Sequence, residues 1–161
     1  MAVSKSFTRM ATIAICFNQA IASDNGTKTK KINTNYFPTA SAETCSWSLA
    51  LGTKRMPDND CRGIGESWYY LQNALGVYNS LAHASGVDEA SYKSDTFCLM
   101  KDCEKVSMVS ASGENLSSGQ TLFIRCKGFG SSPTDVPRSA MIAMHHEEII
   151  AIQDTAVDVF T

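Results

Sequence analysis

The N-terminus constrains this chain most, because it has the layout of a secretory leader. Lys5 and Arg9 precede an apolar run from Met10 to Phe17, and a small-x-small tripeptide ends at Ala22. A charged stretch, a short apolar stretch and such a tripeptide are together typical of a signal peptide. The sequence therefore predicts that residues 1–22 are removed and that the mature protein is secreted into an oxidising, extracellular environment. The alternative is an N-terminus that is not cleaved.

The same apolar run is too short to cross a membrane, since a transmembrane helix needs about 20 apolar residues. The chain has 161 residues and a net charge of −2, without a basic cluster. Such a chain is poorly suited to binding nucleic-acid phosphates or an anionic membrane surface. We therefore expect neither nucleic acid nor membrane as a partner. No cofactor is expected either, because no nucleotide-binding fingerprint is present.

The cysteine count bears on how a secreted chain is held together. Six cysteines are encoded, but Cys16 would leave with the leader, so an odd number remains. An odd count indicates a free thiol, an intermolecular bridge or further processing. The candidates for disulfides are Cys61, Cys98, Cys103 and Cys126. Four cysteines allow three pairings, and the sequence leaves the choice between them open.

A dibasic pair suggests further processing. Lys54-Arg55 resembles the site cut by kexin-type secretory proteases, and residues 23–55 are polar enough to be a spacer or propeptide. Cleavage there would remove Cys45 and leave residues 56–161, with an even number of cysteines, as one compact domain. The competing interpretation makes Cys45 to Leu51 an integral strand.

The periodicity predicts an α+β fold, a two-layer sandwich with one or two helices packed on an antiparallel sheet and stapled by disulfides. From Gly65 to Ala84, apolar residues recur at three- and four-residue steps, which favours an amphipathic helix. We expect this helix to pack onto a strand at 121–127. Its predicted packing face is Trp68, Leu71, Leu75 and Tyr78.

Further strands are expected at 44–51, 96–100 and 104–110. The last of these is expected to form a hairpin with the strand at 121–127. Residues 138–148 contain good helix formers after Pro137, and 149–152 is rich in isoleucine. We therefore expect a helix that runs into a final strand.

No group of residues has the spacing of an established metal or catalytic motif. The histidine-rich stretch at 145–148 lacks the spacing that places two imidazoles on one helical face, so a solvated polar face is expected and no metal. His83, Glu114 (or Glu104), Arg125 and His145 occur in the order that small secreted fungal ribonucleases use. That order resembles a general base, a phosphate-binding guanidinium and a general acid.

The whole layout resembles the small cysteine-stabilised secreted proteins of fungi, which include effectors and killer-toxin-like proteins. The leader, the Lys54-Arg55 pair and Cys61 just before the expected helix carry this resemblance. It implies a non-enzymatic virulence effector or toxin-like protein that binds a host or competitor protein, outside cells or after translocation into a host cell. We expect a monomer. The alternative is a small secreted hydrolase such as a ribonuclease.

Overall fold

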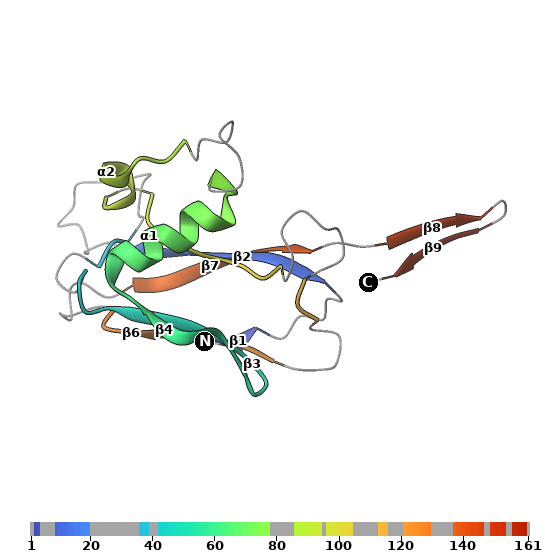
Figure 1. Cartoon of the computed structure of the whole chain (residues 1–161), viewed down its shortest axis with the longest axis horizontal. Coiled ribbons are helices and arrows are strands. Elements are labelled where there is room, and N and C mark those ends of the chain that lie inside the picture. Colours follow the sequence, from blue (N-terminus) through green and yellow to red (C-terminus); the bar gives the residue numbers. More distant parts are fainter. Residues whose placement is uncertain are drawn as a thin grey trace, which may run out of the picture.

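In a computed structural model of the chain, the structure describes residues 2–3, 9–19, 36–38, 42–77, 86–94, 96–104, 113–115, 121–129, 137–146, 149–153 and 156–160. These residues form three antiparallel sheets and two helices (Figure 1). The two larger sheets face each other, and buried apolar side chains from both form one core between them. The predicted α+β class is therefore confirmed in its coarse form, with few helices on antiparallel sheets.

The larger sheet has the strand order β1-β6-β3-β4. β3 (Ser46–Leu51) lies between β6 (Leu122–Lys127) and the edge strand β4 (Lys54–Arg62), and β1 (Ala2–Val3) pairs with the other side of β6. Trp47 and Leu49 of β3 are almost fully buried in the core, and Ser48 and Ala50 between them are buried as well. The strands predicted at 44–51 and 121–127 are confirmed. The described partners of β6 are β1 and β3. The strand predicted at 104–110, and with it the predicted hairpin, lies almost entirely outside the described residues.

The apolar run of the predicted leader forms β2 (Met10–Gln19), the central strand of the second sheet. β5 (Cys98–Asp102) pairs with one side of it and β7 (Pro137–His146) with the other. The inward-facing side chains of β2 are at most 5% exposed: Met10, Ile13, Ile15 and Phe17. Cleavage after Ala22 stays a prediction, but it would take a central strand away from this fold.

The predicted helix begins near the expected place but is shorter. α1 (Gly63–Ala74) starts where Glu66 Oε2 accepts a hydrogen bond of 2.7 Å from the N–H of Arg62. It stops before Gly76, whose φ of 73° breaks the helix. The predicted residues from 78 to 84 lie outside the described part of the chain.

The packing face of α1 was predicted wrongly in part. Leu71 is buried at 3% exposed, whereas Leu75 is 38% exposed. The helix lies against β5 and β4, not against the strand at 121–127 (Figure 1). A second short helix, α2 (Glu89–Tyr92), adds Tyr92, whose ring packs on Trp68 with centroids 4.9 Å apart.

The C-terminal helix predicted over 138–148 is wrong, because most of these residues belong to β7. Along β7, Met141, Ala143 and His145 are exposed while Ile142 and Met144 pack against the core. That alternation has the period of a strand, and pairing with β2 outweighs the helical propensity of the residues. The predicted final strand is confirmed as β8 (Ile149–Gln153), in a hairpin with β9 (Ala156–Phe160). Within the described residues, no helix has the length and apolar content that crossing a membrane requires.

Candidate binding site

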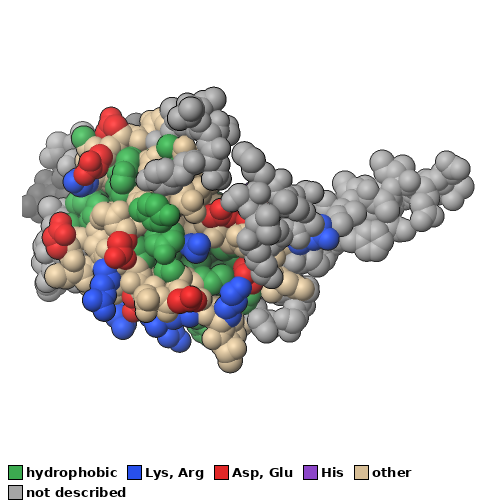
Figure 2. Space-filling view, in the orientation of Figure 1, with side chains coloured by type: hydrophobic (Ala, Val, Ile, Leu, Met, Phe, Trp, Pro, Cys, Tyr) green, Lys and Arg blue, Asp and Glu red, His purple; other side chains and the backbone are tan. Residues whose placement is uncertain are grey.

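A groove of about 880 Å³ runs between the edge strand β4 and the first turns of α1. Its size lies within the usual range for ligand sites. Pro57 to Arg62 form one wall, and Glu66, Tyr69 and Tyr70 of α1 form the other. Figure 2 shows hydrophobic side chains in the middle of one face of the molecule, with acidic and basic side chains around them.

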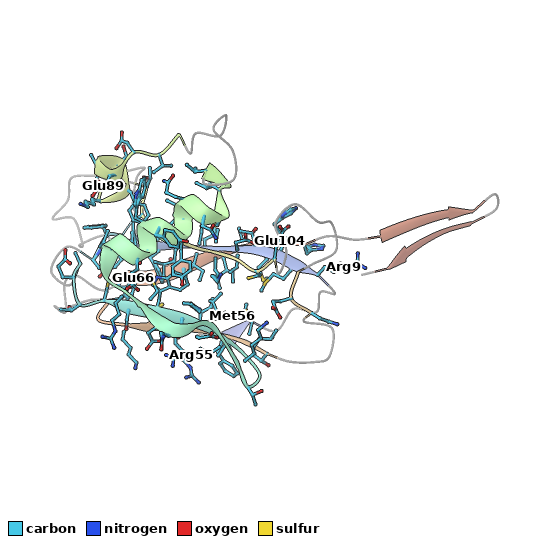
Figure 3. All side chains as sticks on the ribbon, in the orientation of Figure 1. Arg9, Arg55, Met56, Glu66, Glu89 and Glu104 are labelled. Carbon is cyan, nitrogen blue, oxygen red and sulfur yellow. The ribbon has the colours of Figure 1, made fainter. Side chains whose placement is uncertain are left out.

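The register of β4 explains why this wall is open. β3 pairs with β4 at Met56 and again at Cys61, so a single β3 residue, Ser48, faces the four residues between them. This bulge carries Asp58 and Asn59 outward, and both are exposed. Among the described strands, β4 is also the last of its sheet, so one edge of its backbone faces away from β3. Figure 3 shows Arg55 and Met56 on opposite sides of this strand.

Two adjacent tyrosines supply the apolar surface of the groove. Tyr69 is 53% exposed, and its ring meets the ring of Tyr70 edge-on at 5.6 Å. Tyr70 in turn packs edge-on against Trp47 at 5.8 Å, and the ammonium of Lys101 lies 5.2 Å from its ring centroid. Burial raises the pKa of the Tyr70 hydroxyl. Tyr70 is thus held in place by the core, whereas Tyr69 is exposed on the wall of the groove.

The charges of the groove are largely fixed by one another. Asp60 pairs with Arg55, and Lys127 lies 3.9 Å from its other carboxylate oxygen. The hydroxyl of Ser48 and the guanidinium of Arg55 hold the pKa of the Asp60 carboxyl below its usual value. The result is a polar wall of mixed sign and not a strongly basic or acidic patch.

A smaller hollow of about 270 Å³ continues past Arg55 and Pro57 toward the end of β5. Lys54 pairs there with Glu114, whose side chain is only 9% exposed. Because the two hollows share Arg55, Pro57 and Asp58, together they follow most of the length of β4. An extended ligand fits this shape better than a compact one.

Cys61, which lines the groove, belongs to a buried hydrogen-bonded cluster. Trp47 Nε1 donates to Ser67 Oγ at 3.0 Å, and Ser67 Oγ donates to the carbonyl of Gly63 at 2.8 Å. The Cys61 sulfur lies 3.6 Å from the same hydroxyl. Burial raises the pKa of the Cys61 thiol to about 12, so this thiol is protonated at neutral pH and is a poor nucleophile. These contacts fix α1 onto the sheet.

The predicted ribonuclease residues that the structure describes lie on different elements of the fold. The backbone of Glu114 forms hydrogen bonds with the backbone of Met10. His145, on β7, lies opposite Thr12 of β2. Arg125 is in the other sheet and alternates with the buried Leu122 and Ile124, so its exposed side chain points away from the core.

Glu104, the alternative to Glu114, follows β5, and its N–H donates a hydrogen bond of 2.9 Å to the Asp102 carboxylate. His83 lies outside the described residues, so the hydrolase alternative stays a prediction. In the part of the chain that the structure describes, no group of three or more histidine, cysteine or acidic side chains could hold a metal ion.

The predicted disulfide residues are free thiols in this structure. Cys61 on β4 and Cys126 on β6 both lie opposite Trp47, one on each side of β3. Cys98 begins β5, and Cys103 comes just after its last residue. Cys45 is buried at 1% exposed and directly precedes β3, so the integral strand of the competing interpretation is present.

The predicted cleavage site is part of this fold. Lys54 and Arg55 are the first residues of β4 and both form ion pairs. Cutting after Arg55 stays a prediction, and it would separate β3 from the rest of the sheet.

The groove was not predicted from the sequence, because only the packing face of the helix was derived there and Tyr69 and Tyr70 are not part of it. The helical period was a usable signal. Residues on one helical face lie three or four positions apart, so Tyr69 and the buried Leu71, two positions apart, belong to different faces of α1. Comparison of the chain with protein-family models, with curated proteins and with solved structures finds no match.

Proposed function

We propose that this protein acts by binding, and that it takes an extended peptide segment of a partner protein into the groove along β4. The observation that carries the proposal is the open edge of β4 beside the exposed ring of Tyr69. An edge strand offers backbone donors and acceptors to an added strand, and neighbouring pockets give side-chain selectivity. Tyrosine is enriched among the residues that dominate binding energies.

The charges of the groove fit a polar peptide. Asp58, Arg62 and Glu66 are exposed along its walls, whereas Asp60 is already paired with Arg55. A partner segment with alternating acidic and basic residues would meet complementary charges on both walls. The role we propose for such binding is that of an effector or toxin-like protein directed at a host or competitor protein.

Export is a separate part of the proposal, and so is stapling by disulfides. The binding-competent form is proposed to keep β2, because this strand supports the sheet that faces β3 and β4. N-terminal sequencing and intact mass of protein recovered from the culture medium test export directly. A secreted chain beginning at Ser23 that still binds peptide would contradict the retention of β2.

Short peptides displayed on phage, selected against the purified full-length chain, test the binding proposal. We expect selected peptides to bind with an affinity that Tyr69→Ala lowers by about tenfold or more, which corresponds to about 1.4 kcal/mol. Met141→Ala is the matched control, since Met141 is 64% exposed but lies on β7, in the other sheet.

Methylation of alternate backbone nitrogens in the selected peptide should also weaken binding, because it removes the donors of strand pairing. Fluorescence anisotropy measures each affinity. Equal affinities for the wild type and Tyr69→Ala, or an equal loss in Met141→Ala, would refute the groove as the site.

A further inference from the structure

Two cysteines far apart in the sequence lie directly opposite each other in the second sheet. Cys16 on β2 and Cys98 on β5 are register partners in the antiparallel ladder. Cys45, Cys61 and Cys103 are buried, whereas Cys16, Cys98 and Cys126 are partly exposed. Of these three, Cys126 lies opposite Trp47 and not opposite another cysteine.

The hydrogen bonds of the ladder show which kind of pair this is. The N–H of Cys103 donates to the carbonyl of Ala11 at 2.8 Å, which marks a hydrogen-bonded position. Antiparallel ladders alternate between hydrogen-bonded and non-hydrogen-bonded pairs. Cys16 lies five residues after Ala11 on β2, an odd number of steps, so Cys16 and Cys98 form a non-hydrogen-bonded pair. The Cα atoms of such pairs are about 4.5 Å apart, which lies within the range that a disulfide spans.

The pair lies on the accessible face of its sheet. The neighbouring partners Ile15 and Leu99 point into the core and are 1% and 0% exposed. Because side chains alternate along a strand, Cys16 and Cys98 point to the opposite face. A small thiol reagent can therefore reach them without unfolding the core.

A hydrogen bond between the two thiols gives them different pKa values and therefore different reactivity. A hydrogen bond with Cys98 lowers the pKa of the Cys16 thiol to about 7, against the opposing effect of burial. The pKa of Cys98 is raised, by the same hydrogen bond and by burial. Burial also raises the pKa of the thiols of Cys61, Cys103 and Cys126. Cys16 is thus the thiol best able to begin an exchange near neutral pH.

We propose that Cys16 and Cys98 are an oxidisable pair that closes into a cross-strand disulfide and fastens β2 to β5. The oxidant is a small disulfide such as oxidised glutathione. The Cys16 thiolate attacks one glutathione sulfur, forms a mixed disulfide and releases the first glutathione thiolate. Cys98 then loses its proton and attacks the Cys16 sulfur, which releases the second glutathione. Two cysteine thiols are oxidised, one oxidised glutathione is reduced, and the two protons pass to the two released thiolates.

The disulfide would link the N-terminal strand β2 covalently to β5. The bridge would close a loop from residue 16 to residue 98, and a disulfide across a long loop stabilises the folded state against the unfolded chain. The proposal does not depend on peptide binding in the groove, because neither cysteine lines it.

The test uses the full-length protein, reduced and then equilibrated with oxidised and reduced glutathione at graded ratios. Samples are quenched in acid, alkylated and mapped by mass spectrometry. We expect a linked peptide pair containing Cys16 and Cys98 to form before any other disulfide. The midpoint of thermal unfolding should rise by roughly 4–16 °C in the oxidised wild type.

Variants separate the two thiols. Cys16→Ser should abolish both the linked pair and the stabilisation, whereas Cys98→Ser should accumulate a mixed disulfide of Cys16 with glutathione. Cys126→Ser is the control and should leave the linked pair intact. A first disulfide that involves Cys126 or Cys103, or a Cys16 that remains fully reduced in excess oxidised glutathione, would overturn the proposal. The mapping of the wild type needs no variant, so misfolding of a variant leaves the test decisive.

Discussion

Removal of residues 1–22 is the change that most sharply tests the place of β2 in this fold. Four side chains of this strand lie in the core: Met10, Ile13, Ile15 and Phe17. Burying one such side chain contributes about 1.5–3 kcal/mol, so the four together contribute about 6–12 kcal/mol. This range is an upper bound, because the unfolded chain already buries part of its apolar surface. It is nevertheless comparable with the whole free energy of unfolding of a typical domain, about 5–15 kcal/mol.

The loss extends beyond these four side chains. β2 is the only described strand that joins β5 to β7, so its removal leaves each of these without its partner. We therefore expect a chain beginning at Ser23 to lack cooperative unfolding in urea and to expose apolar surface. Circular dichroism in the near and far ultraviolet, with urea titration of both chains, measures this.

Single substitutions within the full chain separate a packing effect from a general effect of truncation. Ile13→Ala should lower the free energy of unfolding by about 2–5 kcal/mol. Thr12→Ala, one residue earlier and on the partly exposed face, should change it by less than about 0.5 kcal/mol. A truncated chain that unfolds cooperatively with the stability of the full chain would refute the reasoning and support a cleaved leader.

Two further predictions concern α1 and the outer face of the larger sheet. Leu71→Ala should destabilise the protein by about 2–5 kcal/mol and Leu75→Ala by less than about 1 kcal/mol, since only Leu71 is buried. Urea denaturation of both variants measures these losses, and equal losses would contradict the prediction. Folding lowers the pKa of Asp60 through Ser48 and Arg55, so its contribution to stability is full above the ordinary carboxyl pKa and is lost as the pH falls through the lowered value. Asp60→Asn should therefore flatten the acid side of a stability–pH curve, and an unchanged curve would show that this carboxylate adds nothing.

The elements predicted correctly are those whose residue pattern favours only one kind of secondary structure. β3 and β6 combine alternating apolar residues with strand-forming types, and both were predicted. β7 was mistaken for a helix, because its residues have helical propensity while its strand pairing comes from β2, far away in the sequence. The end of α1 was placed too late, since the apolar steps in the sequence continue past Gly76, whose φ of 73° ends the helix.

The groove could be predicted only in part. The residues of α1 that line it belong to a helix that the sequence predicted. The bulge in β4, however, depends on how the four residues between Met56 and Cys61 meet a single residue of β3. No local pattern reports that register. The open edge of β4 likewise follows from the order of strands in the sheet, which is a property of the whole chain.

The N-terminal run shows why a short apolar segment has two physical interpretations. A signal peptide needs an apolar stretch of about 7–15 residues, and a buried strand is consistent with an apolar run of about 4–8. Met10 to Phe17 satisfies both, and the charged residues before it do not separate them. Cys16 offers an experiment that separates them, because it lies opposite Cys98 in the ladder and is lost if the leader is removed. A disulfide between these two residues in the protein isolated from its natural source would therefore decide for the strand, since it can form only in a chain that has kept its N-terminus.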